Sequence, residues 1–346
     1  MQELIKNENV LLPEYIPDIL PGREKEIKDI SYNFKIALDG RKPENLLVYG
    51  SPGTGKTAVV KFITKELEDY SNKVKIVHIN CWHIGTRYGI IAEMAKRIGF
   101  IAPMKGMSIE DLFNRISEII LKKRIIVIVI LDEMDKLILS GHSDILYDLS
   151  RMNEVYNVKI SMVGIINELN LITTLDPRIR SSVINADVEF KPYTVPQLKE
   201  ILNERARFAF YDYDEDAIGL AAAYGYKLNG DARISISILL NSGRIAEKKG
   251  ANKLMVEHVQ EAFKSKSYIM RKVEKNEIKL NPEEKKIIDI LKKGGITSGE
   301  LYKKLPGMNE RTIRNYIKKL EETGLIELKE VVGKGKTRMI KMKDNV

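Results

Sequence analysis

The sequence predicts an α/β domain built on a parallel sheet, then a helical region and a small C-terminal module. A glycine-rich stretch, Gly50–Thr57, follows the apolar run 46–49 and leads into a helical pattern that starts at Ala58. A continuous apolar run at 125–131 is typical of a parallel strand that is buried on both faces. From Val195 onward the pattern is wholly helical. These observations together predict the fold class.

The glycine-rich stretch has the residues and spacing of a P-loop between a strand and a helix. Its glycines let successive backbone N–H groups surround a polyphosphate, and the helix N-terminus adds partial positive charge. We expect Lys56 to reach the terminal phosphates and Thr57 to hold Mg²⁺. A chance match in a glycine-rich turn is the alternative, which the flanks and the spacing disfavour. The predicted nucleotide-binding residues here are Gly50, Ser51, Pro52, Gly53, Thr54, Gly55, Lys56, Thr57 and Ala58.

Polar residues follow two later strands at the edge where a parallel sheet places its ligands. Asp132 and Glu133 end the run that starts at 125, and Asn167 ends the predicted strand 158–166. Asp132 can hold Mg²⁺ or its water, Glu133 can polarise the water that attacks the γ-phosphate, and Asn167 can orient that water. The alternative is a strand that simply ends in solvated acids. With the P-loop upstream, the pattern predicts ATP hydrolysis as well as binding.

Several arginines are candidates for contact with a nucleotide. Some occur where a cation without an anionic partner is unfavourable, and others could reach the nucleotide of a second subunit. Arg178 or Arg180 could act as a finger on a neighbouring subunit's γ-phosphate, or could cap its own helix C-terminus. Arg205 falls on an apolar helix face, so it needs a nucleotide phosphate or an internal acid as partner. Arg233 lies in a first helical turn, where the macrodipole disfavours a cation and a bound phosphate would remove the conflict.

Length and composition limit the classes of protein to consider. A chain of 346 residues is expected to form two or three domains. A single cysteine, Cys81, excludes an internal disulfide, and four scattered histidines give no metal-ligand spacing. The longest apolar run has seven residues, whereas a membrane span needs about 20. We therefore expect a cytoplasmic protein with no membrane partner and no signal peptide.

The positive charge is concentrated near the C-terminus. Residues 281–346 contain 16 Lys/Arg and 10 Asp/Glu, an excess of 6 in a chain whose net charge is +9. Such an end suggests a polyanionic partner, most plausibly nucleic acid. The alternative is a solvated Lys/Glu-rich surface of the kind found in heat-adapted proteins.

The C-terminal pattern predicts a winged helix. Helices are expected over 283–291, 298–305 and 309–320, with Ser298 and Asn309 as the caps of the last two, and a hairpin over 325–332 and 337–342. One outer face of the third helix carries a basic stripe that suits the DNA major groove. A protein-docking role for the same fold is the alternative. The DNA-binding candidates of this module are Arg311, Arg314 and Lys318 on the helix and Lys334, Lys336 and Arg338 on the wing.

With these motifs the chain resembles the archaeal origin-recognition and cell-division-cycle replication initiators, a family of AAA+ ATPases. The matching segments are 20–24 (LPGRE), 50–57 (GSPGTGKT), 131–137 (LDEMDKL), 176–182 (DPRIRSS) and 230–233 (GDAR). The resemblance implies an AAA+ domain over 1–193 with an insertion at about 84–121, a helical lid over 194–272 and a winged helix over 280–346.

The resemblance also implies roles for single residues. Asn167 matches sensor 1, Arg233 matches sensor 2, and Tyr193 and Arg205 match nucleotide-contacting positions. The insertion matches an element that touches DNA in this family, and the basic residues that flank its apolar stripe are Lys96, Arg97 and Lys105.

The expected function is that of an ATP-dependent initiator that binds double-stranded DNA at replication origins and helps to recruit or load an MCM-type replicative helicase. ATP or ADP and Mg²⁺ are the expected cofactors, other initiator paralogues are further partners, and the expected location is the cytoplasm, at the nucleoid. A signalling ATPase or a nucleotide-sensing transcription regulator with a winged helix is the alternative. Binding to origin fragments against scrambled DNA separates these functions.

Overall fold

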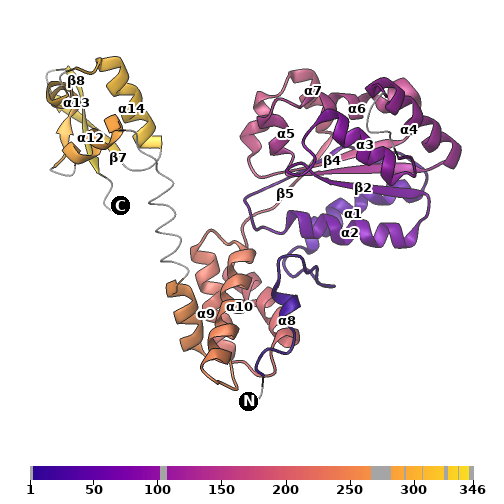
Figure 1. Cartoon of the computed structure of the whole chain (residues 1–346), viewed down its shortest axis with the longest axis horizontal. Coiled ribbons are helices and arrows are strands. Elements are labelled where there is room, and N and C mark those ends of the chain that lie inside the picture. Colours follow the sequence, from indigo (N-terminus) through magenta and orange to yellow (C-terminus); the bar gives the residue numbers. More distant parts are fainter. Residues whose placement is uncertain are drawn as a thin grey trace. The chain divides into compact units, whose positions relative to one another are not determined.

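The computed structural model describes residues 3–101, 107–265, 282–291, 294–305, 307–322, 326–333 and 335–342. The chain forms two compact units, Met1–Lys264 and Ser265–Val346 (Figure 1). Within the described residues, no helix combines the length and the apolar character that crossing a membrane requires.

The first unit contains a parallel sheet whose strand order is β2-β3-β4-β1-β5. The order places β1, which carries the P-loop, beside β4, and β4 beside β3, so the polar ends of the three strands are neighbours. The strands are β1 (Leu46–Tyr49), β2 (Val74–Asn80), β3 (Ile126–Asp132), β4 (Ile160–Ile166) and β5 (Ala186–Glu189). The predicted α/β class with a parallel sheet is confirmed.

Helices cover both faces of this sheet, which explains why β3 is apolar at every position (Figure 1). Val127, Val129 and Leu131 pack into one core, whereas the alternate residues of β3 pack into the other. One face is covered by α1 (Glu24–Leu38) and α2 (Lys56–Tyr70). The other is covered by α3 (Arg87–Arg97), α4 (Ile109–Lys123), α6 (Asp144–Tyr156) and α7 (Pro177–Val183), with the short α5 (Asp135–Leu139) and η2 (Leu169–Thr174) at the strand ends.

A separate helical core follows the sheet in the same unit. It is built from α8 (Val195–Ala209), α9 (Glu215–Lys227), α10 (Ala232–Lys248) and the helical residues 256–265. The first residues of the chain, including η1 (Glu8–Leu11), pack in this core, where Leu4, Val10 and Leu11 are buried. The sequence carried no signal for that contact, because it joins segments about 190 residues apart.

The described residues of the second unit form three helices and a small antiparallel sheet of order β6-β8-β7, as a winged helix requires. Its core includes Ile287, Leu301, Ile313 and Ile340. Thr297, not the predicted Ser298, caps the second helix, because its side chain accepts the backbone N–H of Glu300. The elements are α12 (Pro282–Leu291), β6 (Ile296–Thr297), α13 (Ser298–Lys304), α14 (Glu310–Glu322), β7 (Ile326–Gly333) and β8 (Gly335–Met342).

Candidate nucleotide site

The P-loop needs its glycines for two physical reasons. Gly53 and Gly55 have φ angles of +75° and +87°, which L-residues with side chains rarely adopt. A Cβ at Gly53 would also collide with the carboxylate of Asp231, which belongs to the helical region. A side chain is therefore disfavoured at both positions, and the loop lies directly against the start of α10.

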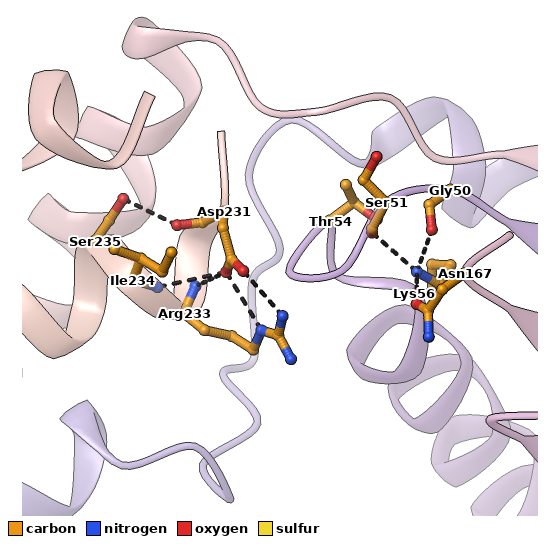
Figure 2. Close-up of polar contacts among 9 residues, drawn as sticks. All are labelled: Gly50, Ser51, Thr54, Lys56, Asn167, Asp231, Arg233, Ile234 and Ser235. Atoms are coloured by element: carbon orange, nitrogen blue, oxygen red, sulfur yellow. Dashed lines mark hydrogen bonds and ion pairs between the residues drawn. The ribbon is translucent and has the colours of Figure 1, made fainter. Parts of the chain in front are cut away.

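The ammonium group of Lys56 is held by oxygen atoms at the end of the sheet (Figure 2). It donates hydrogen bonds to the carbonyls of Gly50 and Ser51, over 2.6 and 3.0 Å, and to Oδ1 of Asn167 over 2.9 Å. Burial lowers the pKa of Lys56 to about 8, although the carboxylate of Asp135 opposes this shift. The predicted P-loop lysine and the predicted sensor 1 residue thus meet directly.

Two oxygen groups lie together beside this lysine. The hydroxyl of Thr57 donates to Oδ1 of Asp132 over 3.0 Å, and Nε2 of His78 lies 3.3 Å from the other oxygen of that carboxylate. Mg²⁺ is commonly bound by one or two protein oxygens together with substrate phosphates and water. The pair of Thr57 and Asp132 fits that donor set. Sequence analysis assigns His78 no role at this site, because its contact with Asp132 depends on the pairing of β2 with β3.

Glu133 follows Asp132 in a strained backbone conformation with φ of +56°, which turns the chain sharply at the end of β3. Burial raises the pKa of Glu133, the charge of Asp132 adds to the rise, and a hydrogen bond from Asn80 opposes it. A carboxylate with a raised pKa is a better proton acceptor. Asp135, which sequence reasoning also missed, accepts the backbone N–H of Asn167 over 2.8 Å and so fixes the sensor.

Arg233 reaches the same site from the helical region. Its guanidinium donates to the carboxylate of Asp231, with Nη2 to Oδ2 at 2.9 Å, and this pairing raises the pKa of Arg233 (Figure 2). The predicted conflict between a cation and the helix dipole is therefore already relieved by the N-cap residue, without a phosphate. The backbone N–H of Ala232 donates to the carbonyl of Gly53 over 3.1 Å, which joins α10 to the P-loop.

Arg205 lacks the internal acid that the sequence suggested as one of its two possible partners. Its guanidinium donates to the backbone carbonyls of Val10 and Tyr15, and it lies 4.9 Å from the centre of the Tyr15 ring. No carboxylate pairs with it in the described part of the chain, so the internal acid is a wrong prediction. Two backbone carbonyls and an aromatic face contact the cation instead.

A buried arginine that sequence reasoning left without a role supports the P-loop from behind. Nε of Arg23 donates to the carbonyl of Thr54 over 3.0 Å, and Nη2 donates to the carbonyl of Lys191 over 2.6 Å. Its guanidinium also pairs with Glu26 and stacks on the ring of Tyr193 at 3.9 Å. The segment 20–24 could have indicated this role, since it places an arginine just before the first helix.

One cavity of about 380 Å³ brings these residues together. It is lined by the P-loop from Pro52 to Ala58, by the polar residues that end β3 and follow β3 and β4, and by residues 11–17 and 19–21. The predicted site residues that line it are Pro52, Gly53, Thr54, Gly55, Lys56, Thr57, Ala58, Asp132, Glu133, Asn167, Tyr193, Arg205 and Arg233.

The two finger candidates occupy α7, and Arg178 lies outside this cavity. It is 83% exposed and pairs with Asp176, the N-cap residue of its own helix, so a C-terminal cap is excluded for it. Arg180 is partly buried on the same helix. An exposed arginine at the start of a helix is accessible to a second subunit.

The DNA-binding candidates are split between the two units. On α14, Arg311 and Lys318 are exposed, and Arg314 donates to the hydroxyl of Tyr302 and to Glu310. On α3, Lys96 and Arg97 both pair with Glu93. Lys105 and Lys334 lie outside the described residues, as do the side chains of Lys336 and Arg338.

Comparison with known proteins extends over nearly the whole chain. An ORC1-type DNA replication protein 1 from Sulfurisphaera tokodaii is 35% identical over 353 residues, which is 96% of this chain and 88% of that protein. An ORC1-type DNA replication protein from Thermococcus kodakarensis is 35% identical over 97% of this chain and 86% of its own. The chain belongs to the ORC1-type DNA replication proteins.

The domains of this ORC1-type protein match three family descriptions. Residues 40–172 match the AAA domain, residues 199–264 the Cdc6 AAA+ ATPase-type lid domain, and residues 283–336 an HTH domain. The fold is similar to that of the Aeropyrum pernix ORC1 protein, solved in complex with DNA, with 33% identity, a TM-score of 0.71 and coverage of 99% of this chain and 94% of that one. The chain is an AAA+ ATPase of the replication-initiator type, as the resemblance implied.

Proposed function

We propose that this ORC1-type protein uses the binding and hydrolysis of ATP to control its hold on double-stranded DNA at replication origins. The observation that carries the proposal is the convergence of the P-loop, the strand ends and the start of α10 on one cavity. A nucleotide in that cavity contacts both the sheet domain and the helical region. Its state can therefore change how the two are joined.

The chain's own residues divide the work on ATP. Lys56 would exchange its bonds to loop carbonyls for bonds to the β- and γ-phosphates, and Asn167 would keep its amide near the attacking water. Glu133 would accept a proton from that water, for which its raised pKa suits it. Arg233 would leave Asp231 and bind the γ-phosphate, and Arg178 or Arg180 would act on the nucleotide of a neighbouring subunit.

Thr57 and Asp132 would hold Mg²⁺, because their oxygens lie together next to the phosphate loop. When bound, the ion would neutralise charge on the phosphates. Residues 1–193, with the insertion at about 84–121, would form the ATPase domain, residues 194–272 the lid and residues 280–346 the DNA-binding domain.

For DNA, the winged helix supplies the exposed Arg311 and Lys318 on α14 and the basic wing. The Aeropyrum pernix relative in complex with DNA supports this role. Lys96, Arg97 and Lys105 would add contacts from the insertion. A protein bound at origins would lie at the nucleoid, where an MCM-type replicative helicase and other initiator paralogues would be its partners.

The test is duplex binding to fragments of the host chromosome's origins against scrambled DNA, in the presence of ATP, ADP or no nucleotide. We expect tighter binding to origin fragments and an affinity that differs between the ATP and ADP states. The variant Lys56→Ala should keep DNA binding but lose its response to nucleotide. Equal binding to origin and scrambled DNA would favour the alternative in which the winged helix docks a protein. Equal binding with ATP and with ADP would contradict the proposal that ATP controls DNA binding.

A further inference from the structure

The beginning of the chain forms an N-terminal strap, residues 4–17, that runs from the helical core to the nucleotide cavity. Its first part is fastened to the end of α8 by backbone hydrogen bonds. The N–H groups of Lys6 and Asn7 donate to the carbonyl of Ala209 over 2.7 and 3.2 Å, and the N–H of Tyr211 donates to the carbonyl of Leu4 over 3.0 Å. The strap therefore starts from a fixed position on the helical region.

The second part of the strap is a wall of the nucleotide cavity. Residues 11–17 line it, and Ile19, Leu20 and Pro21 continue the same wall. These residues are mostly apolar, whereas the P-loop side of the cavity offers Lys56, Thr57 and Asp132. A triphosphate fits the P-loop side. The base of the same nucleotide would then lie at the apolar wall, which suits a flat heteroaromatic ring.

Arg205 ties the two ends of the strap's cavity-lining turn together. Its Nη1 donates to the carbonyl of Val10 and its Nη2 to the carbonyl of Tyr15, so the two bonds bracket residues 11–14. The guanidinium also lies over the Tyr15 ring, at 4.9 Å from its centre. Arg205 is 9% exposed, and its buried Nε has no hydrogen-bond partner in the described part of the chain.

The cost of burying this cation indicates that its position matters. Burial lowers the pKa of Arg205, and among the described residues only neutral carbonyls and a ring compensate for the lost water. Both carbonyls belong to the strap, and they lie on either side of its residues 11–14. The bonds thus hold one wall of a ligand site in place.

We propose that Arg205 is a positioning residue for the base of the nucleotide: it fixes the strap that contacts the base and leaves the phosphates to Lys56 and Arg233. The proposal rests on the proposed nucleotide function. It differs from the expectation that Arg205 itself contacts phosphate. If Arg205 contacted phosphate, its loss would weaken the binding of a ligand that has phosphates but no base. If Arg205 positions the strap, the affinity for such a ligand should change little.

The experiment compares ATP with inorganic tripolyphosphate, both with Mg²⁺, by calorimetric titration of the full chain. Arg205→Ala should weaken ATP by roughly tenfold, the scale of a lost charged hydrogen bond, and should change tripolyphosphate by less than about threefold. Arg205→Lys should recover part of the loss, since an ammonium can still donate to one carbonyl. Arg207→Ala is the matched control, because Arg207 lies on the same helix and is 70% exposed. That control should bind both ligands as the parent does.

A double-mutant cycle with Tyr15→Ala tests the path through the strap. If Arg205 acts through the strap, each single change should weaken ATP binding more than tripolyphosphate binding, and the second change should add little to the first. The inference is overturned if Arg205→Ala weakens tripolyphosphate as much as ATP, or if the two changes add fully. If Arg205→Ala does not fold, Tyr15→Ala and Arg205→Lys carry the same comparison. The proposed function is tested separately by ATP binding to the parent protein, because no outcome for these variants changes that measurement.

Discussion

Nζ of Lys56 donates a hydrogen bond to Oδ1 of Asn167 over 2.9 Å, which connects the P-loop to the end of β4. The same ammonium bonds the carbonyls of Gly50 and Ser51. To reach a phosphate, Lys56 exchanges some of these bonds, and the freed amide of Asn167 can then turn to the attacking water. Binding and water orientation are thus linked through one side chain.

This link separates the effects of two substitutions. Lys56→Ala should abolish tight ATP binding, because it removes the cation that faces the phosphates. Asn167→Ala should lower the turnover of bound ATP while changing the ATP dissociation constant by less than about threefold, since an amide contributes a weaker bond than a cation. Equilibrium titration and single-turnover hydrolysis measure the two effects. Lys65→Ala, an exposed change on the same helix, is the control. A loss of ATP affinity in Asn167→Ala as large as that in Lys56→Ala would contradict the separation.

Glu133 is expected to act in chemistry rather than in binding. Glu133→Gln should retain ATP while turnover falls by roughly 10²-fold or more, because the amide cannot accept the proton of the attacking water. Quenched single-turnover assays measure this. Glu118→Gln makes the same chemical change on the exposed side chain that pairs with Arg115, and it should leave the rate as it is. A wild-type rate in Glu133→Gln would show that another group takes the proton.

Most of the candidate site could be predicted because its motifs are local in the sequence. The P-loop, the acids after β3 and Asn167 after β4 are read from local spacing, and the sheet order brings them together because all three strands run parallel. The partners of the arginines could not be predicted in this way. Arg205 bonds carbonyls about 190 residues away, and only the folded chain shows that contact. His78 likewise meets Asp132 through strand pairing, which local pattern does not specify.

Arg233 pairs with Asp231. We expect Asp231 to compete with a phosphate for Arg233, because the two groups would be alternative anionic partners of one guanidinium. Arg233→Ala should therefore weaken ATP binding or slow hydrolysis without unfolding the protein. Asp231→Asn should tighten ATP binding, since it removes a negative charge beside the P-loop and keeps a side-chain oxygen that can cap α10. Titration with ATP and with ADP measures both changes. Unchanged affinity and turnover in Arg233→Ala would leave the pair with Asp231 as a purely structural contact.

Loss of the buried Arg23 should reduce the stability of the protein more than loss of an arginine in an exposed ion pair. It is 3% exposed and bonds Thr54, Lys191 and Glu26, so Arg23→Ala leaves the carbonyl of the buried Thr54 and the partly buried carboxylate of Glu26 without this partner. We expect the free energy of unfolding to fall by about 3 kcal/mol or more. Arg41→Ala removes a pair with Asp39 that is mostly exposed and should cost less than about 1 kcal/mol. Urea unfolding of both variants checks this, and equal losses would mean that the Arg23 bonds contribute little.

DNA is expected to be held at two places, by the winged helix and by the insertion in the ATPase domain. The candidates on α14 are Arg311, Arg314 and Lys318, and those on α3 are Lys96 and Arg97. Each phosphate contact releases counterions, so log affinity should fall against log salt with a slope of about −0.9 per contact on duplex DNA. Removing residues 281–346 should weaken binding and flatten that slope, and should leave a remainder carried by the insertion.

The same measurement separates base reading from phosphate contact within the winged helix. Arg314 donates to the Tyr302 hydroxyl over 3.1 Å and to Glu310 over 3.3 Å, so its guanidinium contacts a tyrosine of α13 and the first residue of α14. If Arg314 reads a base, Arg314→Ala should lose discrimination between target and random DNA, whereas Lys334→Ala should weaken both about equally and reduce the salt slope by about one contact. Two outcomes contradict the two-place arrangement: no duplex binding by the shortened protein even at low salt, or an affinity and a salt slope that truncation leaves unchanged. In the first case the winged helix alone holds DNA, and in the second the basic charge of residues 281–346 serves another partner.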